Sequence, residues 1–430
     1  MIGKRFGATL LMGMVLVVSA CTSGGGATTS PSAAASAAPS AEAPSVAPSV
    51  EPAAELVIWA DDIRAKALKP LADQYAAENG VKVTVEAIAK DITTKFKTAS
   101  KAGTGPDIVV WANDVIGDFV ANGVIDPVQL ADTAGFDPAS IKAMTYQGQL
   151  FGIPYSVENI GLYINPDLVK ACPATIEDVV SQGQALVKAT TVKEIMALQV
   201  GQKGDAYHIW PLWVSGGGSY FGLTATGDPD PKNVTVDSEG SLAAGAKLSA
   251  LGEKGVGALK RSIDDKNAIP LFFNKETAFL FSGPWALGDI KKAGTAYDIC
   301  PIPPFKDGVT ATPFIGVNGF YVASQGKNKT LAQDFATSFL TTQEVQTALY
   351  KADPRRPALL ASVAEVAAND PDIAKFQAAG KDGVSLPVIP AMGQVWGPFG
   401  TAEAAIVGGA DVKTSLTAAA EAIRAGIAKQ

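Results

Sequence analysis

Three segments determine the fold: ELVIW at 55–59, VKVTVEA at 81–87 and DIVVW at 107–111. The first and third are short apolar runs, as expected of strands buried on both faces, and the second alternates with period two like a strand. Apolar residues at helical spacing fill the intervals, at 68–75 before Gly80 and at 92–99. Strands that alternate with helices in this way predict an α/β fold with right-handed crossovers.

The composition fits a protein of two domains that does not bind polyanions. The 430 residues are 47% hydrophobic and 18% charged, which allows a sizeable core in each of two domains. The 35 basic and 42 acidic residues give a net charge of −7, and loss of Lys4 and Arg5 with the leader described next makes it −9. The sequence has no basic stripe interleaved with aromatic residues, so we expect neither nucleic acid nor an anionic lipid surface as an electrostatic partner.

The amino terminus predicts export. Lys4 and Arg5 precede an apolar run at 10–18 that is too short for a stable membrane anchor, so residues 1–21 are expected to be a signal peptide. Its end, Val-Ser-Ala-Cys at 18–21, resembles the bacterial lipobox, in which the cysteine is lipidated and becomes the first residue. This predicts an extracytoplasmic lipoprotein held through Cys21 on the outer face of the cell membrane. The alternative is an ordinary signal peptide with an incidental cysteine.

Residues 22–54 are expected to be a disordered tether. They are almost entirely Gly, Ser, Thr, Ala and Pro, and such a segment cannot bury enough apolar surface to offset its conformational entropy. Fully extended, it would reach about 110 Å. The tether would therefore hold a folded body clear of the membrane.

Acidic residues follow two of the expected strands. Trp59 is followed by Asp61 and Asp62, and Trp111 by Asp114. Each tryptophan could be a core residue and each aspartate a helix N-cap. However, ligands of α/β sheets bind beyond the carboxyl ends of the strands, so the repeated arrangement favours a binding site.

The rest of the chain continues the mixed pattern. Strand-like stretches are expected at 154–165, 278–281 and 314–317, with a long helix after Asp237 and a mostly helical region from about 330, interrupted by a loop at 386–399. An aromatic run at 207–213 contains Trp210 and Trp213, for which packing and ligand contact remain equally open.

An ordered set of motifs resembles the maltose/maltodextrin-binding proteins of ABC importers over residues 55–429. The motifs are GPDIVVWAND at 105–114, PYSVE at 154–158, YHIWP at 207–211, FNKETA at 273–278, GPWA at 283–286 and the late Trp396. The resemblance implies a two-lobe periplasmic-binding-protein fold of the α/β class, with hinge crossovers and a ligand cleft between the lobes. The crossovers are expected near 156–159, near 305–312 and around Asp353. The expected boundaries are 55–157 plus 311–353 for lobe 1 and 158–310 plus 354–430 for lobe 2.

The same resemblance implies the ligand-binding residues. They are Trp111 and Asp114 on the first lobe, Glu158 near the hinge, Asp205 and Tyr207 on the second lobe, Trp285 as a floor, Trp396 in the late loop, and Asp62 with Arg64 in place of an Asp–Lys pair, to within one residue of alignment. The sequence departs from the family pattern at Val115, His208, Gly397 and Gly400. These departures remove two charged donors and some stacking surface, so the sugar could differ from maltose.

The implied function is capture of an oligosaccharide by lobe closure and its delivery to the permease of an ABC importer, with maltose or maltodextrin as the expected sugar and a monomer as the expected state. Aromatic faces suit the apolar face of a pyranose, and charged side chains suit its hydroxyl rim. The alternatives are a different oligosaccharide, or an exported glycosidase that uses Asp114 and Glu158.

No catalytic residue, cofactor or metal is expected. His208 is the only histidine and has no G-x-S-x-G motif to accompany it, and Asp228 and Asp230 flank a proline in what we interpret as a solvated turn. Cys172 and Cys300 both fall in the second lobe that the resemblance implies. In an exported protein they are expected to form a disulfide, the alternative being two buried free thiols.

Overall fold

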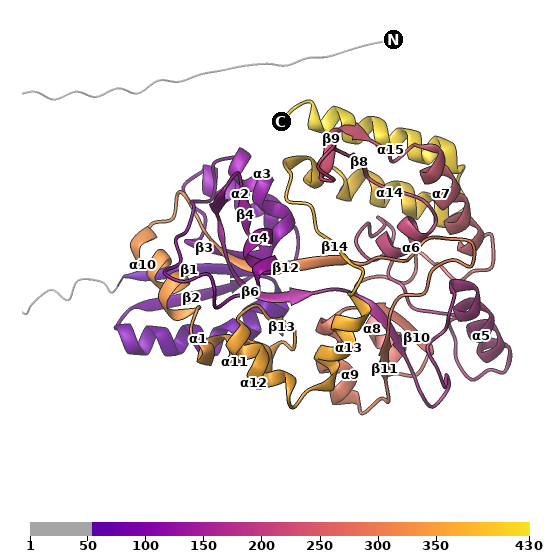
Figure 1. Ribbon diagram of the computed structural model, residues 1–430, viewed down its shortest axis with the longest axis horizontal. Coiled ribbons are helices and arrows are strands. Elements are labelled where there is room, and N and C mark those ends of the chain that lie inside the picture. The colour runs from indigo at the N-terminus through magenta and orange to yellow at the C-terminus, as the bar shows by residue number, and fades with distance from the viewer. Residues whose placement is uncertain (1–53) are drawn as a thin grey trace, which may run out of the picture. The chain divides into compact units, whose positions relative to one another are not determined.

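The computed structural model describes residues 54–430, which form two α/β lobes, each built around its own sheet (Figure 1). The seven-stranded sheet of the first lobe has the order β13-β6-β12-β3-β1-β2, with β14 paired to β12. Its strands are β1 (Glu55–Ala60), β2 (Lys82–Ala87), β3 (Ile108–Ala112), β6 (Gly152–Glu158), β12 (Phe314–Val322), β13 (Arg356–Pro357) and β14 (Val384–Ser385). β1 pairs in parallel with β2 and β3, whereas β12 is antiparallel to both β3 and β6.

The second lobe contains a smaller, antiparallel sheet of β7 (Gly161–Ile164), β10 (Phe279–Ser282) and β11 (Asp298–Cys300), with β7 in the centre. Two hairpins complete the strands: β4 (Thr145–Tyr146) with β5 (Gln149–Leu150), and β8 (Phe221–Leu223) with β9 (Pro229–Val234).

Helices cover both sheets. Those around the larger sheet are α1 (Asp62–Asn79), α2 (Ile92–Lys101), η1 (Asn113–Val115), α3 (Ile116–Ala121), α4 (Pro138–Ala143), α10 (Lys329–Asp334), η3 (Phe335–Phe339), α11 (Gln343–Ala352) and α12 (Leu360–Ala367). The others are α5 (Ile176–Lys188), α6 (Trp210–Ser215), α7 (Glu239–Leu251), α8 (Ala268–Phe273), η2 (Pro284–Ala286), α9 (Leu287–Ala293), α13 (Pro371–Ala379), η4 (Pro390–Gln394), α14 (Trp396–Val407) and α15 (Val412–Ile427).

The larger sheet is buried on both faces, as the apolar runs predict. Along β12, Phe320 and Val322 belong to one apolar cluster, whereas Tyr321, the residue between them, belongs to the cluster on the opposite face. All three side chains are almost fully buried. This two-sided burial fixes the register of the strand that leads back from the second lobe.

The chain crosses between the sheets where one continuous strand was expected at 154–165. β6 ends at Glu158 in the larger sheet, and β7 begins at Gly161 in the smaller one. The buried Asn159 lies at the crossing, and its Nδ2 donates hydrogen bonds to the carbonyl oxygens of Ile160 (3.2 Å) and Phe376 (3.1 Å). The chain returns along 301–313 into β12, which lies beside β6 (Figure 1).

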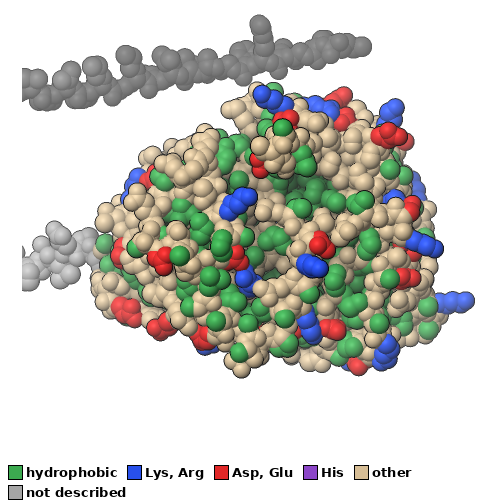
Figure 2. Space-filling view, viewed as in Figure 1, with side chains coloured by type: hydrophobic (Ala, Val, Ile, Leu, Met, Phe, Trp, Pro, Cys, Tyr) green, Lys and Arg blue, Asp and Glu red, His purple; other side chains and the backbone are tan. Residues whose placement is uncertain are grey.

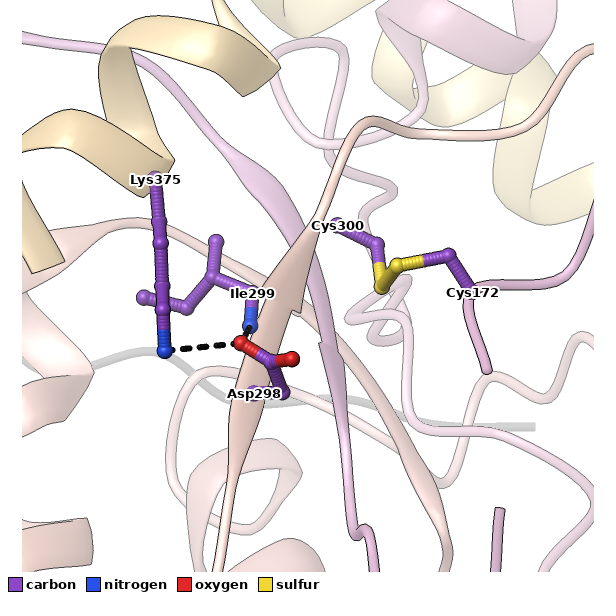
Figure 3. The surroundings of a disulfide bond; sticks show 5 residues. All are labelled: Cys172, Asp298, Ile299, Cys300 and Lys375. Atoms are coloured by element: carbon purple, nitrogen blue, oxygen red, sulfur yellow. Dashed lines mark hydrogen bonds and ion pairs between the residues drawn. A yellow bond between two sulfur atoms is a disulfide. The ribbon is translucent and has the colours of Figure 1, made fainter. Parts of the chain in front are cut away.

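Cys172 and Cys300 form a disulfide, with their Cα atoms 5.7 Å apart (Figure 3). The bond ties the loop before α5 to the end of β11, so the alternative of two free thiols does not hold. Beside it, Lys375 of α13 forms an ion pair with Asp298 of β11 at 2.8 Å.

Several expectations fall on residues 1–53, which lie outside the described part of the chain. These are the signal peptide, lipidation at Cys21 and nearly all of the tether. Within residues 54–430, no helix has both the length and the apolar character needed to cross a bilayer. On the face drawn in Figure 2, acidic and basic side chains are interspersed.

Candidate functional site

A cavity of about 580 Å³ brings together eight of the nine ligand-binding residues expected from the sequence. They are Arg64, Trp111, Asp114, Glu158, Asp205, Tyr207, Trp285 and Trp396. The first four come from α1 and from the ends of β3 and β6, and the other four come from segments around the smaller sheet and the start of α14. Of the two strand ends singled out in the sequence, that of Trp111 and Asp114 lines the cavity, whereas Trp59, Asp61 and Asp62 do not line it.

Asp62 is the residue that the structure does not bring to this cavity. Its side chain is exposed in the first turn of α1. The neighbouring Asp61 is instead the N-cap of that helix, where its Oδ1 accepts a hydrogen bond from the backbone N–H of Arg64 at 2.9 Å, and its Oδ2 pairs with the Arg64 guanidinium. Asp61 therefore reaches the cavity only through Arg64, which it holds in place, because an N-cap carboxylate points back over the first turn.

Arg64 is fixed by five surrounding side chains. Besides Asp61, its guanidinium donates hydrogen bonds to the hydroxyl of Tyr155 at 3.0 Å and to Oδ1 of Asn318. It also lies 5.4 Å from the centre of the Trp111 ring and 3.9 Å from Oε1 of Glu158. A cation held this firmly presents a pre-oriented donor beside an aromatic face.

Glu158 is held by an arginine that was not predicted from the sequence. Arg355 pairs with Oε2 of Glu158 and donates from Nε to Oδ2 of Asp353 at 2.6 Å. All three side chains are buried, and the Arg355 guanidinium lies 5.5 Å from the centre of the Trp285 ring. The sequence signal was weak, since two arginines between Pro354 and Pro357 are also typical of an exposed turn.

Some of the tryptophans line the cavity, and others pack in the hydrophobic core. Trp111, Trp285 and Trp396 line the cavity and are only half-buried. Trp213 is fully buried, and Trp210 stacks on Phe314 with ring centres 4.3 Å apart. The question left open for Trp210 and Trp213 is therefore answered in favour of packing.

Trp396 is not in a loop, as the sequence led us to expect, but is the first residue of α14. The Gly397-Pro398 pair that suggested a loop lies in the first helical turn, where proline costs no backbone hydrogen bond. From this position the indole Nε1 donates to Oδ2 of Asp114 at 3.0 Å. Burial raises the pKa of Asp114 to about 7, although the bond from Trp396 opposes this shift.

Asp205 organises the opposite wall. Its Oδ1 accepts from the backbone N–H of Tyr207 (3.1 Å) and of His208 (2.9 Å), and its Oδ2 lies 3.0 Å from Nδ1 of His208 and also accepts from Gln199. Burial by itself would raise the pKa of Asp205, but the attraction of the His208 ring and these hydrogen bonds lower it to about 2. Asp205 is therefore ionised at neutral pH.

Behind this wall lies Glu403 of α14, a second group that was not predicted from the sequence. Its Oε2 accepts from the backbone N–H of Asp205 at 2.6 Å, and its side chain is almost completely buried. Burial, followed by repulsion from Asp205, raises the pKa of Glu403 well above its ordinary value.

Gly400 is one of the departures from the family pattern. Glycine is needed there because its backbone lies very close to that of Gly204. Gly204 has a φ of 75°, and a Cβ atom placed on it would lie 1.8 Å from the carbonyl oxygen of Gly400. The start of α14 therefore packs directly against the loop that leads to Asp205. A larger residue at either position would push these two walls of the cavity apart.

Three polar atoms on the cavity walls are buried and have no hydrogen-bond partner among residues 54–430: Oδ1 of Asp114, the hydroxyl of Tyr207 and Nε2 of His208. Unpaired buried polar atoms are rare in native structures and costly. All three have almost no surface open to water, so a polar ligand would pair with them only where its binding moves the side chains that cover them. Within the same described residues, no group of three or more His, Cys, Asp or Glu side chains is arranged to hold a metal ion.

The sequence is similar to known binding proteins over most of its length. A family model described as bacterial extracellular solute-binding protein matches residues 70–375. The galactooligosaccharide-binding protein of Bacillus subtilis (strain 168) is 28% identical over 397 residues, which cover 87% of this chain and 89% of that protein. The maltotriose-binding protein of Pyrococcus abyssi (strain GE5 / Orsay) is 27% identical and covers 80% of this chain and 75% of its own. A maltooligosaccharide ABC transporter solute-binding lipoprotein of Streptococcus pneumoniae (strain ATCC BAA-255 / R6) is 26% identical, with 80% and 82% covered.

Proposed function

The chain belongs to the bacterial extracellular solute-binding protein family, and we therefore propose that it captures an oligosaccharide in the cavity between its lobes and passes it to an ABC importer. The observation that carries this proposal is the cavity of about 580 Å³, which combines three half-buried tryptophans with fixed charged groups. A volume of this order suits a small ligand, and the mixture of aromatic faces and ionised groups suits a sugar.

The two kinds of wall would bind different parts of a pyranose. Trp285 and Trp396 would cover its apolar face, whereas Arg64 and Asp205 would form charge-assisted hydrogen bonds with its hydroxyl groups. Because Arg64 is fixed by Asp61 and Asp205 by His208, these groups lose little further freedom when a ligand binds. Pre-orientation of this kind raises affinity without adding contacts.

The lobes would act by closure. We propose the boundaries 55–157 plus 311–353 for the first lobe and 158–310 plus 354–430 for the second, with one refinement. The pairing of β13 with β6 and the packing of α12 against α11 favour placing the last crossover between α12 and α13, after Ala367. A sugar that contacts both lobes would favour the closed state by its difference in affinity for the two states.

The sugar we propose first is a maltodextrin, and a galactooligosaccharide is the second candidate. Relatives named for each class are about equally similar to this chain. Val115 and His208 line the cavity and depart from the family pattern. Their contacts with the sugar would distinguish a maltodextrin from a galactooligosaccharide.

We do not propose catalysis. A glycosidase needs one carboxyl group free to donate a proton and another free to attack or to activate water. Here Glu158 is paired with Arg355 and lies close to Arg64, so it is not free for either role. A chromogenic glycoside should accordingly be bound or ignored, but not hydrolysed.

A thermal-shift panel tests the proposal, using the chain from Thr22 to Gln430. A ligand that binds only the folded state must raise the melting temperature, by an amount that grows with the logarithm of its excess over the dissociation constant. We expect an increase with maltotriose or with a galactooligosaccharide of similar length, and none with a polyol control. Melting that is unchanged by every sugar would contradict the proposal.

A further inference from the structure

His208 is the cavity residue for which neither the family resemblance nor the expected site offers a role. The residue is 7% exposed and forms part of the cavity wall. It lies edge-on to Trp285, with ring centres 5.8 Å apart and an interplanar angle of 85°. It is also the only histidine in the 430 residues.

The protonation of the ring follows from its partner. Asp205 Oδ2 lies 3.0 Å from Nδ1, and an ionised carboxylate can only accept hydrogen bonds. Asp205 is ionised at neutral pH because its pKa is about 2. Nδ1 must therefore carry a proton, and in the neutral tautomer that this bond selects Nε2 is the hydrogen-bond acceptor.

That acceptor has no partner. Nε2 is buried, and none of the residues from 54 to 430 donates a hydrogen bond to it. The two other unpaired atoms of the cavity, on Asp114 and Tyr207, belong to the same walls. A buried nitrogen left unpaired destabilises the protein, so a ligand hydroxyl that reaches it as the lobes close would be favoured there.

We propose that His208 is a specificity-determining residue whose Nε2 accepts a hydrogen bond from one sugar hydroxyl in the part of the cavity beside Trp285. This inference rests on the proposed function. It extends that function because it requires the sugar to carry, at one position, a hydroxyl group that donates a hydrogen bond. A site built to pair with a hydroxyl discriminates strongly against an analogue that lacks it, because the buried partner is then left unsatisfied.

The unaltered chain allows a direct test. Because it contains one histidine, the imidazole nitrogen signals in a long-range proton–nitrogen NMR spectrum all come from His208, provided that no histidine tag is used. At about pH 8 we expect the tautomer that the contact with Asp205 selects, with a protonated Nδ1 and an unprotonated Nε2. Saturation with the sugar that gives the largest thermal shift should move the Nε2 signal and leave Nδ1 protonated.

A substitution then connects this signal with specificity. His208→Phe keeps an aromatic ring and removes Nε2 together with Nδ1, the partner of Asp205, so it should weaken binding of the same sugar at least about tenfold, and the deoxy analogues isolate the part due to Nε2. The monodeoxy analogues of that sugar each lack one hydroxyl. One of them should bind the parent chain about tenfold more weakly than the intact sugar does. The same analogue should bind His208→Phe as tightly as the intact sugar binds that variant. This coupling is what a double-mutant cycle isolates.

The outcomes separate the two proposals. If the parent chain binds no sugar, the proposed function fails and this inference fails with it. If the parent binds a sugar, but the Nε2 signal does not move or every deoxy analogue loses the same affinity in both chains, the inference about His208 alone is overturned. The NMR experiment remains decisive even if His208→Phe does not fold.

Discussion

The indole Nε1 of Trp396 donates a hydrogen bond to Oδ2 of Asp114 at 3.0 Å, across 282 positions of sequence. The bond joins the end of β3 to the start of α14, so an aromatic wall and an acidic wall of the cavity hold each other in place. It occupies one oxygen of Asp114 and leaves the other unpaired among the described residues.

The raised pKa of Asp114 predicts a pH-dependent stability. Its ordinary value is 3.8, and burial raises it to about 7, so the folded protein retains a proton that the unfolded chain has already lost between these values. The free energy of unfolding should therefore fall as pH rises from about 4 to 7, with a slope of at most about 1.4 kcal/mol per pH unit. Urea unfolding of the parent and of Asp114→Asn across this range measures the difference, which should be flat above about pH 8. A constant difference at every pH would contradict this account of Asp114.

The cavity tryptophans should carry much of the sugar affinity. Trp285→Ala and Trp396→Ala should each weaken binding by on the order of 1–3 kcal/mol, because each removes a large apolar face. Trp59→Ala is the matched control, since Trp59 lies outside the cavity and its indole bonds Glu86 on a neighbouring strand. Calorimetric titration of the three variants checks this. If the two cavity variants bind as tightly as Trp59→Ala, the cavity is misassigned.

Removing Arg355 should destabilise the fold strongly. Arg355→Met would leave the carboxylates of Glu158 and Asp353 buried without their cation, which costs roughly 3–5 kcal/mol in comparable cases. Adding Glu158→Gln should recover part of this loss. The control is Lys193→Ala, which breaks an exposed pair with Glu276 and should cost less than about 1 kcal/mol. Equal losses in denaturant unfolding for Arg355→Met and Lys193→Ala would show that the buried network contributes little.

The disulfide should stabilise the second lobe without affecting the ligand. Cys172 and Cys300 are 128 positions apart, and replacing both by serine should lower the free energy of unfolding by roughly 2–4 kcal/mol because the unfolded chain is released from a long loop. Neither cysteine lines the cavity, so the dissociation constant for sugar should not change. A large loss of affinity at unchanged stability would contradict this separation of roles.

The lipobox at 18–21 predicts the location of the protein in the cell. Cys21→Ala should remove the acylation site, so that the exported chain leaves the membrane fraction and enters the soluble extracytoplasmic one. Immunoblots of the two fractions would show the change. Cys172→Ser serves as the control for loss of a cysteine and should remain with the membrane. A Cys21→Ala chain that stays membrane-bound would rule out this anchor.

The strands and most of the site could be predicted because both depend on local patterns. Apolar runs indicated β1 and β3, and the motifs that resemble the maltose/maltodextrin-binding family implied eight residues of the cavity. Arg355 and Glu403 could not be found in this way. Their roles come from contacts with Glu158 and Asp205, which are 197 and 198 positions away, and no local spacing encodes such pairs.

The errors have equally physical causes. Asp62 was chosen over Asp61 because adjacent carboxylates look alike in sequence, and only the start of α1 decides which of them caps the helix. Trp396 was expected in a loop because Gly and Pro follow it, yet both are tolerated in a first helical turn. Two strands were merged at 154–165 because the crossing at Asn159 is marked by one buried side chain and no turn motif.

The most direct test of the central claim is a crystal structure of the chain with the sugar that gives the largest thermal shift. We expect sugar density in the cavity, with pyranose rings against Trp285 and Trp396 and hydroxyl groups within hydrogen-bond distance of Arg64 and Asp205. Sugar bound elsewhere on the chain, with these four residues arranged as they are here, would contradict it.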